Sequence, residues 1–205
     1  MRGCSNRCRQ LKKTVNDKKR YEILEGLPVY GPMYIPVTKD GKPFYSEGFV
    51  VRIFKPDGGS WVGNFAMGWT AYNAVYDYPA DDRLVIIAGG QGYIMATTQT
   101  GPLAVFGLSI DQSLQTEANT IVAADQFGLM VIGSAGVLWQ SPRISWDGIK
   151  ELTIDKQIVS GFAFDPTHDK DEWVEFRVDL ETKHLDGGSY RQYYDDEGNY
   201  KKKKS

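Results

Sequence analysis

The sequence has few of the residues that most often build metal and catalytic sites. Of its 205 residues, two are cysteine and two are histidine, His168 and His184. Cys4 and Cys8 stand in a C-x3-C pair, which lacks the further ligands of a zinc or iron–sulfur site. Neither histidine lies in a nucleophile motif, so no Ser-His-Asp or Cys-His arrangement is indicated. We therefore expect no metal and no cofactor, and exposed thiols of this kind favour a reducing compartment.

The sequence also lacks long hydrophobic runs. None approaches the roughly 20 apolar residues of a transmembrane helix, and none follows the basic N-terminus as a secretory signal would require. The absence of both signals predicts a cytoplasmic protein. Hydrophobic residues make up 41% of the chain and charged residues 24%, as in ordinary globular domains. Its 22 glycines and 12 tyrosines favour strands and turns over helices.

The strongest structural signal is LVIIAGGQGYIM, from Leu84 to Met95. An aliphatic run leads into glycines that suit a tight reversal, and a second apolar run follows. Similar pairs of runs begin 37 residues later at Ile121 and 37 residues later again at Ile158. The glycine cluster lacks the G-x-G-x-x-G spacing of a phosphate-binding loop, so we interpret it as a hairpin turn.

Each of the three hairpins has a weaker apolar run before it and a short one after it. Four short strands per roughly 40 residues is the period of a β-propeller blade, although the WD and kelch signatures are missing. Phe49 to Phe54 and Trp61 to Phe65 extend the pattern to a divergent first unit. We predict an all-β fold of three or four consecutive four-stranded antiparallel units, either β-propeller-like or an open curved array. The flanking runs are Ala74–Tyr78, Leu108–Leu114, Ile149–Ile154, Leu103–Phe106, Val137–Gln140 and Thr182–Leu185.

Composition divides the chain into three parts. Residues 1–20 hold eight basic residues and one acid, which predicts a disordered basic leader. A solvated arm and an arm that contacts nucleic acid or an acidic membrane are both open. Residues 21–190 form a single β-repeat domain, in which the proline-rich segment Leu27 to Val37 should run extended along an edge. Residues 191–205 are predicted to be a flexible polar tail.

The net charge of −2 conceals a strongly acidic body. Between Tyr21 and Tyr200 there are 12 basic and 25 acidic residues, a net charge of −13. Such a surface repels nucleic-acid phosphates and attracts basic proteins. We therefore expect a basic protein partner, with no nucleic acid and no membrane bound by the body. Acidity for solubility alone is the alternative.

Acidic loop residues and one loop tryptophan are the predicted partner contacts. The acidic loop near His168 gathers five potential cation ligands, but its spacing matches no EF-hand, so a solvated loop is preferred. The five tryptophans fall near strand ends, where either core packing or a stacking platform would explain them. The predicted contact residues are Asp81, Asp82, Trp146, Asp147, Asp165, Asp169, Asp171 and Glu172.

The segments YGPMYIPV, WVGNF, AGGQGYIM and SWDG resemble those of a family of uncharacterised bacterial proteins of similar size. The resemblance runs from about Leu27 to Tyr190 and leaves out Met1 to Lys19. It implies a small β-repeat fold and carries no catalytic residue. Small acidic β proteins of this kind are also similar to the immunity proteins that accompany bacterial toxins, by analogy and not by a shared motif.

These observations favour a non-enzymatic binding protein. Its particular form would be an immunity protein that neutralises a basic toxin by occlusion. A carbohydrate-active enzyme that uses paired carboxylates is one alternative. A self-assembling scaffold module is the other, because three or four units are few for a closed ring and a free edge could pair with another copy.

Overall fold

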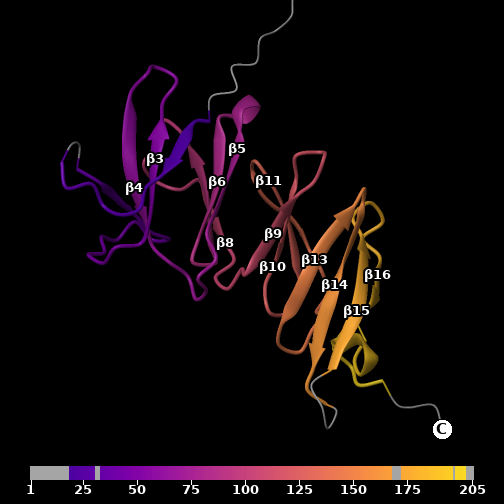
Figure 1. Ribbon diagram of the computed structural model, residues 1–205. Helices are drawn as coiled ribbons and strands as arrows, with labels where there is room; N and C mark the ends of the chain where they lie inside the picture. The colour runs from indigo at the N-terminus through magenta and orange to yellow at the C-terminus, as the bar shows by residue number, and fades with distance from the viewer. Residues whose placement is uncertain (1–18, 31–32, 168–171, 196, 202–205) are drawn as a thin grey trace, which may run out of the picture.

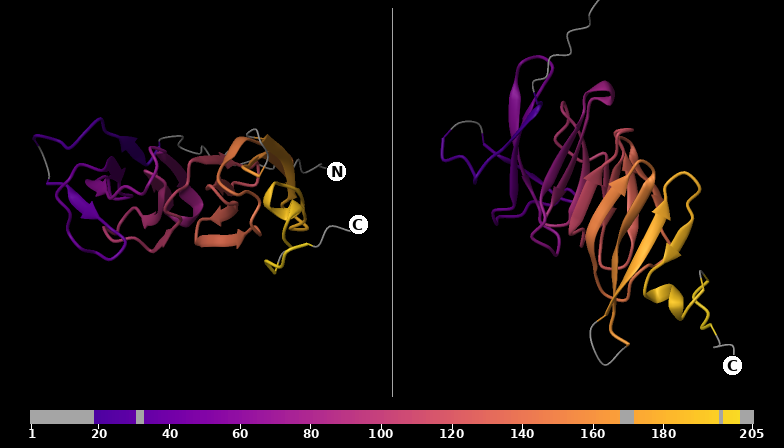
Figure 2. Two further views of the ribbon diagram at one scale, coloured as in Figure 1. Left: turned by 90° about the horizontal axis from the view of Figure 1, so that it is seen from below. Right: turned by 45° about the vertical axis from the view of Figure 1, so that its right-hand side comes forward.

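Four β-sheets stacked face to face in a row make up the protein (Figure 1). The computed structural model describes residues 19–30, 33–167, 172–195 and 197–201. Each sheet has four strands, so the predicted all-β array of four-stranded units is confirmed. The row is open, with sheet 1 at one end and sheet 4 at the other (Figures 1 and 2). Within these ranges no helix has the length and apolar character to span a membrane.

The sheets follow one another along the chain. Sheet 1 contains β1 (Tyr21–Ile23), β2 (Ile35–Val37), β3 (Phe49–Phe54) and β4 (Ser60–Phe65). Sheet 2 contains β5 (Ala74–Tyr78), β6 (Arg83–Ala88), β7 (Gln91–Ala96) and β8 (Ala104–Phe106). Sheet 3 contains β9 (Gln112–Gln115), β10 (Ile121–Ala124), β11 (Leu129–Gly133) and β12 (Gly136–Gln140). Sheet 4 contains β13 (Ile149–Asp155), β14 (Ile158–Asp165), β15 (Glu172–Asp179) and β16 (Leu185–Gly187).

Sheets 2, 3 and 4 share one topology, in which consecutive strands are antiparallel neighbours. Sheet 1 differs, because its order is β1-β3-β4-β2 and β2 runs parallel to β4. The predicted first unit is therefore divergent in topology, and it is not wholly antiparallel. Its proline-containing strand β2 lies at the edge, as predicted for the Leu27 to Val37 segment, since proline cannot donate to a central ladder.

The inner sheets are buried on both faces. In β6, Leu84 and Ile86 pack toward sheet 1, whereas Val85 and Ile87 pack toward sheet 3. The alternate residues of β10 divide in the same way between sheets 2 and 4. A strand with two buried faces needs apolar residues at every position, which explains the unbroken run LVII.

The glycine cluster forms the predicted hairpin. Ala88 pairs with Gln91 across a two-residue turn, and Gly89 and Gly90 have φ values of 53° and 86°. Two consecutive positive φ angles define the turn that suits the twist of paired strands, and glycine adopts them without strain. The side-chain amide of Gln91 donates to the carbonyl oxygens of Phe106 and Gly107, at 2.7 and 2.8 Å, and so joins the turn to β8.

Two predicted strands begin later than expected. Sheet 3 starts at Gln112 and not at Leu108, because Ile110 is buried in the core and its N–H bonds to the Gly90 carbonyl. Sheet 4 ends in β16 at Leu185–Gly187 and not at 182–185. The carboxylate of Asp179 accepts the N–H groups of residues 181 and 182, which makes that segment a turn.

The folded part of the chain is longer than residues 21–190. Arg20, assigned to the leader by composition, accepts the Phe54 N–H on its carbonyl. At the other end, η2 (Tyr190–Gln192) is followed by a bridge between Tyr194 and Tyr200, and the Lys201 N–H bonds to the Tyr193 carbonyl at 2.7 Å. These contacts give residues 191–195 and 197–201, predicted as a flexible tail, a defined path at the end of sheet 4 (Figure 2). The remainder of the predicted leader, residues 1–18, lies outside the described ranges.

Candidate protein-binding surface

The predicted contact residues do not form one site. Asp81 and Asp82 lie at one end of sheet 2, where η1 (Pro79–Asp81) joins β5 to β6. Trp146, Asp147 and Asp165 belong to the loops and strands of the C-terminal sheet, as does Glu172 at the start of β15. Asp169 and Asp171 lie outside the described residues, as does His168, so the acidic loop they were predicted to form is not described.

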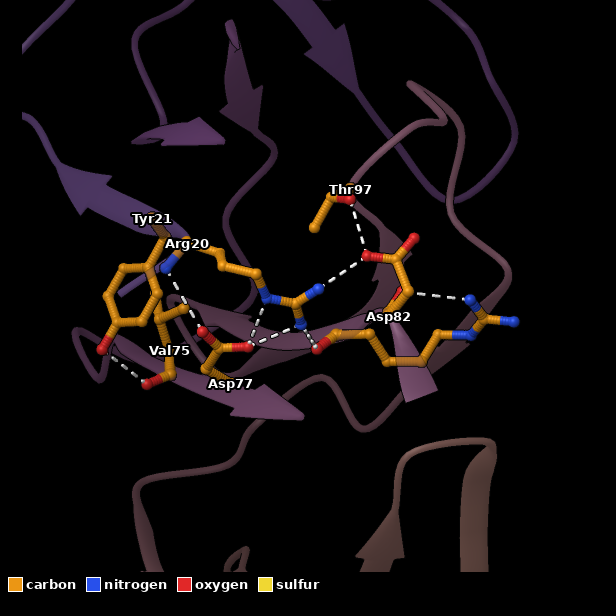
Figure 3. A network of polar contacts seen from close by, with 7 residues as sticks. Arg20, Tyr21, Val75, Asp77, Asp82 and Thr97 are labelled. Carbon is orange, nitrogen blue, oxygen red and sulfur yellow. Dashed lines mark hydrogen bonds and ion pairs between the residues drawn. The ribbon is translucent and has the colours of Figure 1, made fainter. Parts of the chain in front are cut away.

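Asp82 takes part in an internal network that is shown in Figure 3. The Arg20 guanidinium donates to Asp77 Oδ1 at 2.7 Å and to Asp82 Oδ1 at 2.6 Å. The Thr97 hydroxyl donates to the same Asp82 oxygen at 2.7 Å. Since Arg20 directly precedes β1, these contacts fasten sheet 1 to sheet 2. The charge of Asp82 is thereby compensated within the chain, whereas Asp81 beside it is exposed.

Trp146 anchors the C-terminal segment. Its ring lies edge-on to Tyr190 and Tyr194, with centroid distances of 4.9 and 5.8 Å. The Arg143 guanidinium lies 4.6 Å from the Tyr190 ring centroid, and its Nη2 donates to the Trp146 carbonyl at 2.8 Å. The indole is half-buried among these groups, while Asp147 next to it is exposed. Of this pair, Asp147 is therefore the residue that a partner can reach.

Asp165 is buried, with none of its surface exposed. It accepts hydrogen bonds from the backbone N–H and the hydroxyl of Thr167, at 3.0 and 2.6 Å. Asp165 therefore has no exposed surface that a partner could contact. Sequence reasoning placed it in a loop, but it ends β14 and stabilises the turn that follows. In the described part of the chain, no group of three or more His, Cys, Asp or Glu side chains is placed to hold a metal ion.

The acidic charge is concentrated toward the C-terminus. Residues 147–197, which supply sheet 4 and its loops, contain 14 acidic and six basic residues, a net charge of −8. Residues 21–146 contain 11 acidic and six basic residues, a net charge of −5 over a much longer stretch. A basic partner would be steered toward the acidic stretch 147–197, which the lysines at 201–204 follow directly.

A second feature of this end of the array is the outer face of sheet 4. Its residues were not predicted as contacts, because the run IVSGFAF predicts a strand but does not indicate which of its faces a neighbouring sheet covers. Residues that alternate with the buried Val159 and Ala163 point away from sheet 3. Trp173 is 38% exposed and Ile158 is 39% exposed on this side. The outward residues of β14 and β15 are Ile158, Ser160, Phe162, Phe164, Trp173, Glu175, Arg177 and Asp179.

The aromatic residues of this face form a strip. Phe164 is paired with Trp173 across the strands, and their ring centroids are 5.3 Å apart. The Lys150 ammonium lies 4.1 Å from the Trp173 ring centroid, so it caps one end of the strip. Phe162 lies between Lys150 and Glu175 in the ladder. The result is an apolar centre bordered by charged side chains, an arrangement typical of protein interfaces.

The outer face of sheet 1 is not equivalent, because the chain itself covers it. Val50 and Val62, on the side away from sheet 2, are 2% and 1% exposed. Asn64 on the same side accepts the Gly48 N–H at 2.8 Å and donates to the Ser46 carbonyl at 3.0 Å. The segment before β3 is thus held over that face. Of the two ends of the array, sheet 4 presents the open one.

A small pocket beside the tail contains two carboxylates. It has a volume of about 220 Å³ and is lined by Arg143, Tyr190, Asp195 and Glu197 among others. The N–H groups of Asn199 and Glu197 bond to the Asp195 carboxylate, and these bonds lower its pKa below the usual value. Glycosidic bond cleavage requires a carboxylic acid whose pKa is raised, so Asp195 is unsuited to that role. Its carboxylate closes a turn.

Comparison with known proteins adds no family: the chain matches no family model, and no curated protein shows significant sequence similarity to it. The features that bear on function are the acidic charge of residues 147–197 and the open outer face of sheet 4. Both belong to the same end of the array.

Proposed function

We propose that this protein is a non-enzymatic binding module that holds a basic protein partner. The observation that carries the proposal is the net charge of −8 on residues 147–197, at the end of the array. Charge of one sign on one region accelerates the encounter with an oppositely charged protein and disfavours nucleic acid. Acidity for solubility alone would not require this concentration.

The particular form that fits these features is an immunity protein that occludes a basic toxin inside the cell. An inhibitor of this type needs a rigid surface and complementary charge, and it needs no catalytic group of its own. The stacked sheets supply rigidity, because each inner interface is a continuous apolar core.

Affinity capture with charge variants tests the proposal. The full chain is immobilised and exposed to a lysate of its source cells at low and at high salt. One variant, Asp147→Asn with Asp155→Asn and Asp186→Asn, neutralises three exposed acids of the sheet 4 region. We expect the wild type to retain a specific basic protein at low salt and to release it at high salt, because screening weakens attraction between exposed charges. The variant should retain much less of it.

A matched variant with the same change in net charge is the control. Glu25→Gln, Asp57→Asn and Glu117→Gln neutralise three exposed acids outside residues 147–197, none of them a predicted contact residue. This control should capture the partner as well as the wild type does. Equal losses in both variants, or no specific basic protein from the wild type, would contradict the proposal. If the captured protein arrests growth when produced alone, co-production of the chain should restore growth.

A further inference from the structure

The outer face of sheet 4 has the composition of a face that is covered. In β14 the inward positions Gly161 and Ala163 are small, whereas Phe162 and Phe164 on the outward side are large. A strand with one solvated face normally shows the reverse, with the large apolar residues inside and polar residues outside. The described residues nevertheless leave Trp173 38% and Ile158 39% exposed on this side.

The size inversion has a physical reason on the inward side. Gly161 lies opposite Phe176 in the ladder, and a Cβ atom at Gly161 would come within 2.9 Å of that ring. Phe176 therefore fills the space over the glycine from the neighbouring strand, as Phe106 does over Gly92 in sheet 2. The outward rings meet no comparably tight approach, because a Cβ atom at Gly148 beside them would come no closer than 3.6 Å to Trp173 and 3.8 Å to Phe164. Large apolar side chains on an outer face are typical of a surface that another molecule covers.

The charges around the strip indicate what the cover is. Acidic side chains on or beside this face include Asp155, Glu175, Asp179 and Asp186, while Lys150 and Arg177 are the cations in the same ladder. Arg177 already pairs with Glu175 at 2.9 Å, and Lys150 lies over Trp173. If a second copy docked face to face through this surface, these acids would meet the same acids, so repulsion disfavours self-association through sheet 4. Cations on a different protein would complement them.

We infer that the outer face of sheet 4 is the docking surface for the basic partner, and that it receives a segment with an apolar stripe flanked by lysine or arginine. The inference rests on the proposed function and specifies its contact surface. The apolar stripe packs on Phe162, Phe164 and Trp173, and the flanking cations reach the acidic side chains around them. Desolvated aromatic residues at the centre of such a surface supply most of the affinity, and the charges supply the steering.

The probe is a soluble peptide of leucine and lysine in which the leucines recur at helical spacing, so that it presents one apolar stripe between cations. Binding to the full chain is measured by isothermal titration calorimetry. The variant Trp173→Ala removes the most exposed ring of the strip, and we expect it to weaken binding about tenfold or more. Trp69→Ala is the matched control, because Trp69 is 80% exposed and lies between sheets 1 and 2. It should bind like the wild type.

The outcomes separate this inference from the proposed function. If Trp173→Ala binds the peptide as well as Trp69→Ala does, while the triple acid variant still loses its basic partner, the docking face is wrong and the binding function stands. If the peptide binds no better than the same peptide with glutamate for lysine, the inferred partner chemistry is wrong. A doubled molar mass in light scattering that Trp173→Ala returns to the monomer value would make a second copy the occupant and would overturn the inference.

Discussion

Sheets 2 and 4 have the same strand order and differ in how many of their faces are covered. In sheet 2, β6 and β7 are buried from Leu84 to Ala96. In sheet 4, β14 alternates between buried and partly exposed positions. One repeating unit thus serves two purposes. When the unit has a neighbour on each side, its central strands are buried on both faces, and when it stands at the end of the row one face is partly exposed.

The largest loss of stability is expected when an isoleucine is truncated to alanine on a sheet that is covered on both faces. Ile86 has no exposed surface and packs between sheets 1 and 2. We expect Ile86→Ala to lower the free energy of unfolding by about 2–5 kcal/mol, because it leaves a cavity in a closed interface. Ile158→Ala on the open face should cost about 1 kcal/mol or less. Urea unfolding measures both, and equal losses would show that sheet 4 is covered as sheet 2 is.

The joint between sheets 1 and 2 gives the next effect. Arg20→Ala leaves Asp77 and Asp82 without the guanidinium that they share, and the side chain of Arg20 is 20% exposed. The free energy of unfolding should fall by about 1–3 kcal/mol, as expected when charged hydrogen-bond acceptors lose their donor. Lys19→Ala, one residue earlier and exposed, is the control and should change it by less than about 0.5 kcal/mol. Equal changes in the free energy of unfolding for the two variants would show that Arg20 contributes no more to the fold than Lys19 does.

Alkaline pH should affect sheet 2 through its tyrosines. Burial raises the pKa of Tyr78 and of Tyr93 to about 12. In the unfolded chain each ionises near pH 10, so from about pH 10 to about 12 the folded state keeps protons that the unfolded state has released. The free energy of unfolding should therefore fall as the pH rises through this range, and Tyr93→Phe should fall less steeply. A tyrosine absorbance titration completed near pH 10 would contradict this.

The smallest effect should come from the ion pair on the open face. Glu175 and Arg177 are 2.9 Å apart, with side chains 55% and 63% exposed. Glu175→Gln should change the free energy of unfolding by less than about 0.5 kcal/mol, because solvent screens an exposed pair. Its effect on binding of the leucine–lysine peptide should be the larger one. A loss of stability comparable to that of Arg20→Ala would mean that this ion pair is less exposed to solvent than it is in the structure.

The repeat could be predicted because its signals are local. The glycines at 89 and 90, and the 37-residue spacing of the hairpins, fix turns and strands within short stretches of chain. The late starts of β9 and β16 could not be predicted, because Ile110 is buried by distant residues and Asp179 caps a turn in place of extending the strand. Arg20 was missed for a similar reason, since its acidic partners lie 57 and 62 residues away.

By itself the sequence determined the all-β class, the four-strand period and the large negative charge of the body, because turn chemistry, apolar runs and charge are carried by neighbouring residues. The tertiary structure decided which faces those strands cover. It buried Asp165, paired Asp82 with Arg20 and left Trp173 exposed. These outcomes depend on which sheet stands next to which, and no short stretch of the chain contains that information.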